Sequence, residues 1–464
     1  MKSKIISFIL AIVMVGTLLL ALVGCGDDWY VNPDTGERKP IQKIKFLHIW
    51  SECSTEFTKI VNDFMAENPD VRIETVVSNY SDVPSYLNSQ VLSASVPDVF
   101  FYWTNQVAGY AQSDVCLPLD GYMSGWADTY RNGGEAWDLG KVGGKHYSVP
   151  FRCTAEVLVY NKTLFEENNI AIPTTFQEFE AALGKLRALT SSPAFSPIAV
   201  TGVSGGTLTA LYTAFQNFSE LQLGSYLDPA YSQGLITNSD RNLTLEGKML
   251  DKLKDWNAKG YFGQCEGKSK ETSVRNFVEG NAGMLILNNN NLYLLDDAED
   301  MELGFMAIPA PAGVDYTYIT SDYDGFSVYK NTKYPEACIR FLKYLTSKDV
   351  GQYFSEATNS IMAVDGIEYK TERNREVNEA MRDCGKSMFT KNDIQYSTSN
   401  INAKNSEDVI NYILGKKKNV TGRDVAVDIY NRYQLAIADA GLHTVDPTVS
   451  YRWDADFSWL DIKE

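Results

Sequence analysis

The feature that most constrains the fold is a regular alternation of strand-like and helix-like segments after residue 43. Residues 44–50, 71–77 and 98–103 are rich in β-branched and aromatic side chains, which is typical of strands. Between them, residues 57–65 place apolar side chains at helical spacing, and residues 86–95 form a second helix candidate. Alternating strands and helices build an open sheet covered by helices, so the sequence predicts an α/β fold.

Two of these strands end in residues suited to ligand recognition. Trp50 and Glu52 follow the first strand, whereas Trp103 and Asn105 follow the third. Ligands of open α/β sheets bind beyond the carboxyl ends of the strands, so we expect these four side chains in a binding site. The alternative is structural: the rings would pack in the core, and the polar side chains would cap helices.

The rest of the chain continues the α/β rhythm. A strand is expected at residues 156–160, and helices are expected at residues 163–168, 176–189, 208–218 and 245–259. Thr174 or Thr175 is the expected N-cap of the second of these helices. Residues 406–440 read as helical apart from a turn at 415–421. About 440 residues follow residue 24, which is too many for one simple core and natural for two lobes.

The N-terminus has the pattern of an export signal. Lys2 and Lys4 precede an apolar run over residues 5–23, and the run ends in Leu-Val-Gly before Cys25. This ending resembles the lipobox of bacterial lipoproteins, in which the cysteine is diacylated and the chain is cut before it. The predicted organisation is a signal peptide over residues 1–24 and a flexible tether over residues 25–42. The alternative is an uncleaved membrane anchor, because the run is long enough to span a bilayer.

Charge and cysteine content exclude several classes of protein. The net charge of −17 opposes nucleic-acid binding, which depends on neutralising phosphates. Apart from Cys25, six cysteines are scattered without a CxxC motif, and the three histidines are not clustered. We therefore expect no metal site and no cofactor, and mostly buried free thiols.

Short motifs spread along the mature chain resemble the extracellular solute-binding proteins of sugar ABC transporters, in the maltose-binding-like branch. The similar segments are residues 57–73, VPDV at 96–99, LPLD at 117–120, GGKHYSVP at 143–150 with YNKTLF at 160–165, residues 173–179, FVEGNAGM at 277–284, IPAPAG at 308–313 and EACIRFLKYL at 336–345. Two departures concern the ligand. Asn288 to Asn291 replace a sugar-stacking Trp of many members, and residues 361–364 replace a late Leu-Pro turn.

The resemblance implies the periplasmic-binding-protein-like fold, with two α/β lobes and a hinge of several crossovers. Crossovers are expected near residues 153–154, 318–322 and 360. Lobe 1 would combine residues 43–153 with 322–360, and lobe 2 would combine residues 155–317 with 361–464. The implied protein is a monomer, lipid-anchored to the outer face of the cell membrane. It would capture a carbohydrate, expected to be an oligosaccharide, for the permease subunits of an ABC transporter.

Further binding candidates lie near these crossovers and in the Asn-rich segment: Arg152, Glu156, Asn288, Asn290, Tyr293, Tyr323 and Asp324. Arg152 would donate a bidentate pair of hydrogen bonds to the ligand or form a structural ion pair. Glu156 would accept from ligand hydroxyls or satisfy Arg152. The Asn run is either a hydrogen-bonding platform or a loop, and Tyr293 is the aromatic nearest to it.

Two other functions remain open at this point. A glycoside hydrolase would need two carboxylates facing each other across a cleft, but no local catalytic signature such as G-x-S-x-G or H-E-x-x-H is present. A receptor that presents its ligand to a membrane sensor would use the same fold. The sequence favours a binding protein over an enzyme and does not separate transport from sensing.

Overall fold

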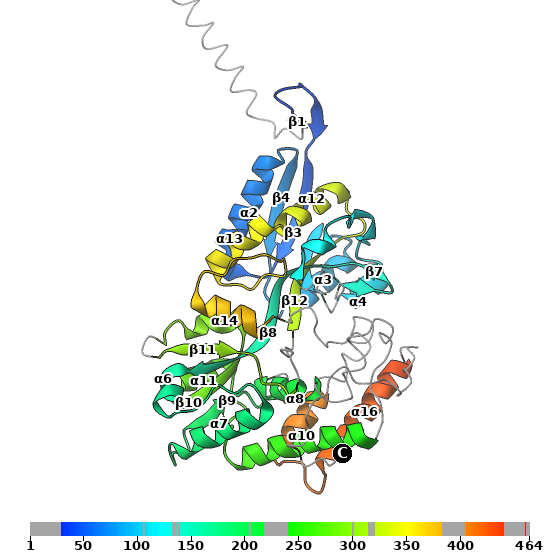
Figure 1. Ribbon diagram of the computed structural model, residues 1–464. Helices are drawn as coiled ribbons and strands as arrows, with labels where there is room; N and C mark the ends of the chain where they lie inside the picture. Colours follow the sequence, from blue (N-terminus) through cyan, green and yellow to red (C-terminus); the bar gives the residue numbers. More distant parts are fainter. Residues whose placement is uncertain are drawn as a thin grey trace, which may run out of the picture.

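The computed structural model describes residues 29–104, 107–131, 137, 140–203, 206–217, 240–298, 301–313, 321–382, 404–439 and 460. The predictions for the signal peptide, Cys25, Asn105 and Cys384 lie outside these residues. Within them, two α/β lobes share one eight-stranded sheet, with strands ordered β4-β3-β5-β12-β8-β10-β9 and β11 paired with β8 (Figure 1). The predicted α/β class is confirmed.

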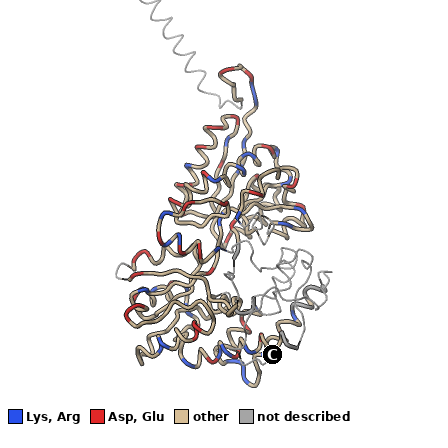
Figure 2. The backbone as a smooth tube through the Cα atoms, in the orientation of Figure 1, with Lys and Arg blue, Asp and Glu red and all other residues tan. Residues whose placement is uncertain are grey.

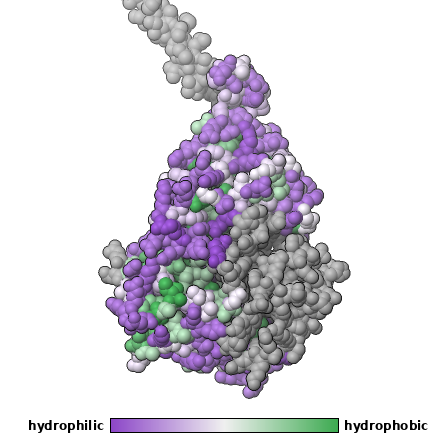
Figure 3. All heavy atoms as spheres, in the orientation of Figure 1, coloured by the Kyte–Doolittle hydropathy of each residue, from purple (hydrophilic) through white to green (hydrophobic). Residues whose placement is uncertain are grey.

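Lobe 1 is built on the strands expected from the sequence. β3 (Gln42–His48) pairs in parallel with β4 (Val71–Val77) and β5 (Val99–Trp103), as the strand–helix rhythm requires. β12 (Ser321–Val328) then inserts antiparallel between β5 and β8 (Val149–Asn161). The helices of this lobe are α2 (Ser54–Glu67), α3 (Val83–Leu92), α4 (Ala108–Gln112), α12 (Pro335–Leu345) and α13 (Lys348–Thr358). On the face shown in Figure 3, this lobe presents mostly hydrophilic residues.

Lobe 2 is built on the second half of β8. That half pairs antiparallel with β10 (Ala282–Asn288) and β11 (Leu303–Met306), and β10 pairs in parallel with β9 (Ser196–Ala199). The helices are α6 (Lys162–Glu167), α7 (Phe176–Ala188), α8 (Thr207–Asn217), α10 (Asp240–Ala258), α11 (Lys270–Val278), α14 (Glu372–Ala380), residues 404–413 and α16 (Gly422–Asp439).

The elements that the sequence predicted lie within a few residues of their observed bounds, except that β8 was predicted too short; β9 to β12, α11, α13 and α14 were not predicted. The predicted strand at 156–160 runs from Val149 to Asn161, because its first half completes a ladder with the distant β12. Thr175 is the N-cap of α7, and it forms a capping box with Glu178. The five cysteines that the structure describes after Cys25 are free and buried, as expected.

The side chains of β8 alternate between two hydrophobic cores. Val157 and Val159 belong to the core that also contains the aromatic cluster of lobe 1, whereas Leu158 and Tyr160 belong to the second core of lobe 2. Successive side chains of a strand point to opposite faces, so one strand contributes to both cores. This packing fixes β8 as the common structural element of the two lobes.

Three chain segments lie side by side where the lobes meet. β8 residues 149–155 pair with β12 on one edge. On the other edge, Cys153 N donates to Ile361 O at 2.8 Å, and Ala363 N donates to Phe151 O at 3.0 Å. The segment expected to be a tether contains a hairpin of β1 (Trp29–Val31) and β2 (Arg38–Pro40), which forms a separate two-stranded sheet.

The register of β12 against β8 shifts at Gly325, and a side chain there would not fit. A Cβ atom at Gly325 would lie 2.6 Å from Val149 O and also against the hydroxyl of Thr104. We predict that Gly325→Ala lowers the free energy of unfolding by about 1–3 kcal/mol, the usual cost of overpacking. Thermal unfolding followed by circular dichroism measures the change. Gly121→Ala is the matched control, because no atom lies within 4 Å of its added Cβ; equal midpoints for the two variants would contradict the prediction.

Candidate functional site

A row of polar side chains runs along one face of β8 through the junction of the lobes. Arg152, Thr154 and Glu156 occupy alternate positions of a strand whose other residues are almost all buried and apolar. Alternate residues share a face, so the three side chains form one row, which we call the β8 polar row. Asp324 of β12 stands opposite Arg152, and Asn288 of β10 stands opposite Glu156. The row therefore spans both lobes.

Arg152 is held within lobe 1 and is not free for ligand. Its Nε atom donates to Asp324 Oδ2 at 2.6 Å, and both side chains are at most 10% exposed. Its guanidinium carbon lies 4.7 Å from the centroid of the Trp50 ring, within the range of a cation–π contact. Of the two readings, the structural ion pair is the one observed, and its partner is Asp324. The expectation that Glu156 satisfies Arg152 is wrong.

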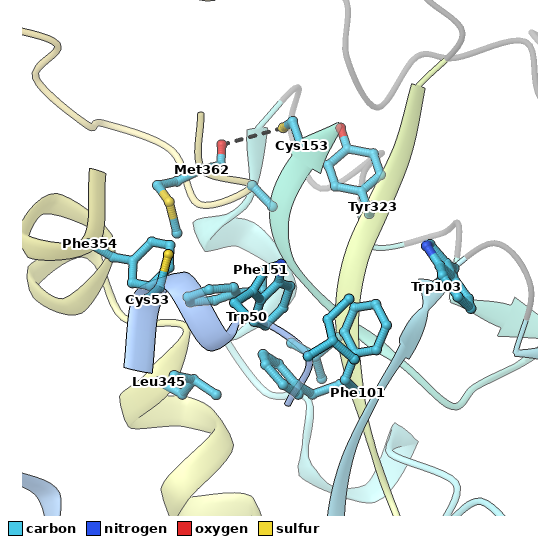
Figure 4. Packing of buried hydrophobic residues seen from close by; sticks show 14 of the residues in the cluster. Trp50, Cys53, Phe101, Trp103, Phe151, Cys153, Tyr323, Leu345, Phe354 and Met362 are labelled. Carbon is cyan, nitrogen blue, oxygen red and sulfur yellow. Dashed lines mark hydrogen bonds between the residues drawn. The ribbon is translucent and has the colours of Figure 1, made fainter. Parts of the chain in front are cut away.

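Trp50 lies in the aromatic core and leaves no face for stacking on a ligand. The ring is 2% exposed and stacks on Phe57 at 5.3 Å with an interplanar angle of 7°. Phe101 and Phe151 also pack against this ring, as Figure 4 shows. The geometry therefore assigns Trp50 to packing. Glu52, two residues later in the short helix η1 (Ser51–Cys53), is exposed.

Tyr323 also lies away from the β8 polar row. It precedes Asp324 on β12 and stands opposite Cys153, so it points to the other face of the sheet, beside Cys153 (Figure 4). Its side chain is fully buried. In this conformation Tyr323 is a packing residue, and a direct role in binding is not supported by its position.

Glu156 combines burial with an unsatisfied oxygen. Its Oε2 atom is buried and accepts no hydrogen bond from the residues that the structure describes. Burial raises the pKa of its carboxyl group to about 7, against a lowering effect from the hydrogen bond with Asn288 and from the charge of Lys270. Buried acceptors in proteins are normally paired, so this oxygen is a candidate contact for a bound molecule.

The four asparagines at residues 288–291 begin the short helix η7 (Asn289–Leu295) and build a network against β8. Asn288 exchanges hydrogen bonds with Thr154 and accepts from the backbone N of Asn290. Asn289 Oδ1 accepts from Ala155 N at 2.8 Å, and its Nδ2 donates to Cys153 O at 3.1 Å. The network clamps β8 between its two halves. The run therefore clamps the protein itself, and its expected role as a hydrogen-bonding platform for a ligand stays a prediction.

Two further residues extend the platform toward the surface. Lys270 of α11 donates to Asn291 Oδ1 at 2.9 Å, which places its positive charge near Glu156. Tyr293 of η7 is 59% exposed, so a face of its ring is available to a ligand. Asn290 is half-buried beside them.

Trp103 stands at the end of β5, directly opposite Asp324 and on the same face as the β8 polar row. Its ring meets Phe101, Tyr102 and Tyr80 edge-on, with centroid distances of 5.3, 5.1 and 4.8 Å. Its Nε1 atom is buried and has no acceptor among the described residues. Figure 4 shows this ring apart from the Trp50 cluster, with the indole nitrogen at its outer edge.

Sequence reasoning missed two members of the site, Thr154 and Lys270, and it did not single out Asn289 within the predicted asparagine run. The alternation of polar residues at 152, 154 and 156 within an apolar segment was a signal for Thr154. No local signal distinguishes Asn289 from its neighbours, and Lys270 comes from another element. A separate cavity of about 450 Å³ lies beside Trp126, Thr346 and Gly366, and none of the predicted site residues lines it.

A family match and two curated relatives agree on the kind of protein that this chain resembles. The model of the bacterial extracellular solute-binding protein family matches residues 51–352. The multiple sugar-binding protein of Streptococcus mutans is 24% identical over 343 residues, covering 70% of this chain and 76% of that protein. An ABC transporter extracellular-binding protein of Pyrococcus horikoshii is 26% identical, covering 75% and 80%.

Solved structures share the fold. RafE from Streptococcus pneumoniae in its apo form has a TM-score of 0.64 at 21% identity and covers 86% of this chain and 99% of its own. The sugar-binding protein MalE from Xanthomonas citri has a TM-score of 0.69 at 16% identity, with coverages of 86% and 98%. The predicted two-lobed fold of periplasmic binding proteins is therefore confirmed.

The ion pair between Arg152 and Asp324 predicts a large effect of removing one partner. Asp324→Asn leaves a buried guanidinium without its counter-charge, so we expect a loss of about 3–5 kcal/mol in the free energy of unfolding. Urea unfolding followed by circular dichroism measures it. Asp63→Asn is the matched control, because Asp63 pairs with Lys59 on the exposed surface of α2 and should hardly change the midpoint. A loss in Asp324→Asn no larger than in this control would show that the pair is dispensable.

The raised pKa of Glu156 predicts a pH-dependent stability. The folded chain holds a proton that the unfolded chain releases between pH 4.5 and about 7. Glu156 therefore makes the protein less stable as pH rises through this window, by roughly 3 kcal/mol at most. Glu156→Gln should raise the melting temperature at pH 8 relative to wild type, with a smaller difference at pH 5. The exposed Glu166→Gln serves as control, and a wild-type-minus-variant difference independent of pH would refute the assignment.

Proposed function

We propose the function of this chain from one premise: it belongs to the family of bacterial extracellular solute-binding proteins. We infer that it captures a carbohydrate, most simply an oligosaccharide, between its two lobes and delivers it to the permease of an ABC transporter. Two relatives or structural neighbours are described as sugar-binding proteins, which supports the carbohydrate assignment. The ligand would contact residues around the β8 polar row.

The observation that carries this proposal is a pair of complementary unsatisfied groups on one face of the sheet. Trp103 Nε1 is a buried donor without an acceptor, and Glu156 Oε2 is a buried acceptor without a donor, among the described residues. A hydroxyl group is both donor and acceptor, so a polyhydroxylated ligand can satisfy both atoms.

The spacing of these groups supports a ligand of more than one sugar ring. Trp103 and Arg152 stand on either side of Asp324, two strand spacings or roughly 10 Å apart. Glu156 lies four residues further along β8, roughly 13 Å at 3.3 Å per residue. Together these offsets separate the two unsatisfied groups by roughly 16 Å. An oligosaccharide spans such a distance. Tyr293 offers a further exposed ring on η7, which follows β10, and Asn105 follows Trp103 in the chain.

Closure of the lobes would complete the site. In the proposed organisation, lobe 1 comprises residues 43–153 and 322–360, and lobe 2 comprises residues 155–317 and 361–464. The three neighbouring segments at the junction would bend, while the clamp by Asn289 keeps β8 continuous. A ligand that contacts both lobes favours the closed state by its differential affinity. Asn288 and Asn290 would contact the ligand, while Arg152 and Asp324 would position the strands.

The proposal also includes the cellular location of the protein. Members of the matched family are extracellular. The N-terminal apolar segment that leads to Cys25 suits cleavage before this residue and lipid attachment to it. Two acyl chains anchor a protein stably, whereas one does not. In the described part of the chain, no helix is both long and apolar enough to cross a membrane. The anchored chain would act as a monomer.

Two alternatives differ in function rather than in fold. The closed protein could signal to a membrane sensor, and neighbouring permease or kinase genes would distinguish transport from sensing. A carbohydrate-active enzyme is less well supported, since the matched family consists of binding proteins. Incubation with oligosaccharides tests for catalysis directly: a released monosaccharide would overturn the binding assignment.

A panel of solutes in a thermal-shift assay tests the proposed ligand class. A bound oligosaccharide at 100 times its dissociation constant should add about 2.7 kcal/mol of stability. Trp103→Ala and Glu156→Gln should each reduce this shift without unfolding the protein, whereas Glu166→Gln should preserve it. If amino acids or peptides raise the melting temperature and carbohydrates do not, the ligand class is wrong. If the ligand raises the melting temperature of both site variants as much as that of wild type, the binding site lies elsewhere.

A further inference from the structure

The hairpin of β1 and β2 presents an unusual surface at the N-terminal end of the described chain. Trp29 is 49% exposed and Val31 is 50% exposed, although both are apolar and lie on one face of β1. Opposite them on β2 are Pro40 and Arg38, and the Arg38 guanidinium lies 5.6 Å from the Trp29 ring. One face of the hairpin is therefore aromatic, aliphatic and basic at once.

The hairpin is an ordered structure without a core of its own. Its turn is closed by Asn32, whose Oδ1 atom accepts from the backbone N of Asp34 and Thr35, and Gly36 adopts a positive φ of 68°. β1 and β2 pair only with each other, and they stand clear of lobe 1 in Figure 1. An isolated two-stranded hairpin is marginally stable in water, so this hairpin would gain from a surface that covers Trp29 and Val31.

Chain length limits what that surface can be. Trp29 is the fourth residue after Cys25, and a fully extended chain spans at most about 3.6 Å per residue. If Cys25 carries lipid, as the proposed function holds, Trp29 lies no more than roughly 14 Å from the membrane-inserted residue. The polar layer on each side of a bilayer is several ångströms thick. The hairpin is thus confined to the immediate neighbourhood of the lipid headgroups.

Charge in this segment favours an anionic surface. The hairpin and the start of β3, residues 29–45, carry four basic side chains (Arg38, Lys39, Lys43 and Lys45) against two acidic ones, so this part is net basic in a chain with a net charge of −17, although Asp27 and Asp28 precede it. All four basic residues are exposed, and Figure 2 shows basic segments in blue in the hairpin and below it. Basic residues next to a membrane anchor bind anionic lipids, and Trp is favoured at the interface between lipid and water.

We propose that this hairpin is a membrane-contact element: Trp29 and Val31 enter the headgroup region, and the basic residues of β2 and β3 bind anionic lipid. The inference rests on the lipid attachment proposed at Cys25 and goes beyond it. A lipid chain alone leaves the protein free to swivel on its tether. A docked hairpin holds lobe 1 next to the bilayer and turns lobe 2 away from it, which restricts the orientations available for meeting a membrane partner.

Trp fluorescence of the full, exported chain in vesicles tests the proposal. The protein is reconstituted into vesicles of anionic phosphatidylglycerol or zwitterionic phosphatidylcholine, each with and without brominated acyl chains as quencher. The Trp29 signal is the difference between wild type and Trp29→Phe. We expect bromolipid to quench this signal in anionic vesicles. Arg38→Glu with Lys39→Glu should shift the docked-to-undocked ratio by at least roughly 25-fold toward undocked, at about fivefold for each basic residue removed, because the two added carboxylates also repel anionic lipid.

Controls separate this proposal from the lipid anchor and from ligand binding. Lys185→Glu with Lys418→Glu makes the same charge change on exposed residues of lobe 2 and should leave the quenching unchanged. Flotation with the vesicles reports the anchor, and the thermal shift with oligosaccharide reports the binding site. Flotation without quenching of Trp29 would overturn the membrane contact and assign this face to a protein partner. Absence of flotation would overturn the anchor and the hairpin proposal together, while the ligand response stands or falls separately.

Discussion

The structure depends on one strand that belongs to two lobes. β8 pairs with β12 through its first half and with β10 and β11 through its second, so its backbone hydrogen bonds join the two halves of the sheet. Each core also takes side chains from β8, which makes a break in this strand costly to both lobes. Motion between the lobes must therefore occur as bending of a paired strand, and Asn289 holds the backbone together where that bending would take place.

The burial of β8 on both faces also explains why a binding site on this strand depends on its few polar residues. A strand buried on both faces is normally a continuous apolar run, and β8 follows that rule except at Arg152, Thr154 and Glu156. Arg152 is compensated inside lobe 1 by Asp324 and Trp50. Glu156 is compensated only in part, because Asn288 and Lys270 oppose the effect of burial without reaching Oε2. The polar row is thus satisfied at its lobe 1 end and left incomplete at the lobe junction, where a ligand can supply the missing hydrogen bonds.

Local periodicity predicted the parallel strands of lobe 1 and most of the longer helices, because these elements carry their own apolar patterns, but it did not predict β9 to β12. Long-range pairing was the part that the sequence did not reveal. Glu156 is four residues from Arg152, yet the two lie roughly 13 Å apart along an extended strand, and Arg152 pairs instead with Asp324, 172 residues away. Trp50 does lie at a strand end, as predicted, but its ring turns into the core beneath α2 and not toward the junction. Trp103, at the equivalent position of β5, lies on the face of the β8 polar row, and its indole nitrogen, like that of Trp50, has no acceptor among the described residues. Position at a strand end was predictable, whereas side-chain direction depended on packing partners far along the chain.

The central claim is that a polyhydroxylated ligand completes the hydrogen bonding of the β8 polar row. A crystal structure of the protein with an oligosaccharide that raises its melting temperature tests this claim most directly. The account predicts sugar hydroxyls within hydrogen-bonding distance, about 2.6–3.2 Å, of Glu156 Oε2 and Trp103 Nε1, with both lobes in contact with the ligand. A sugar bound away from β8, for example in the cavity beside Trp126, with both atoms still unpaired, would contradict it.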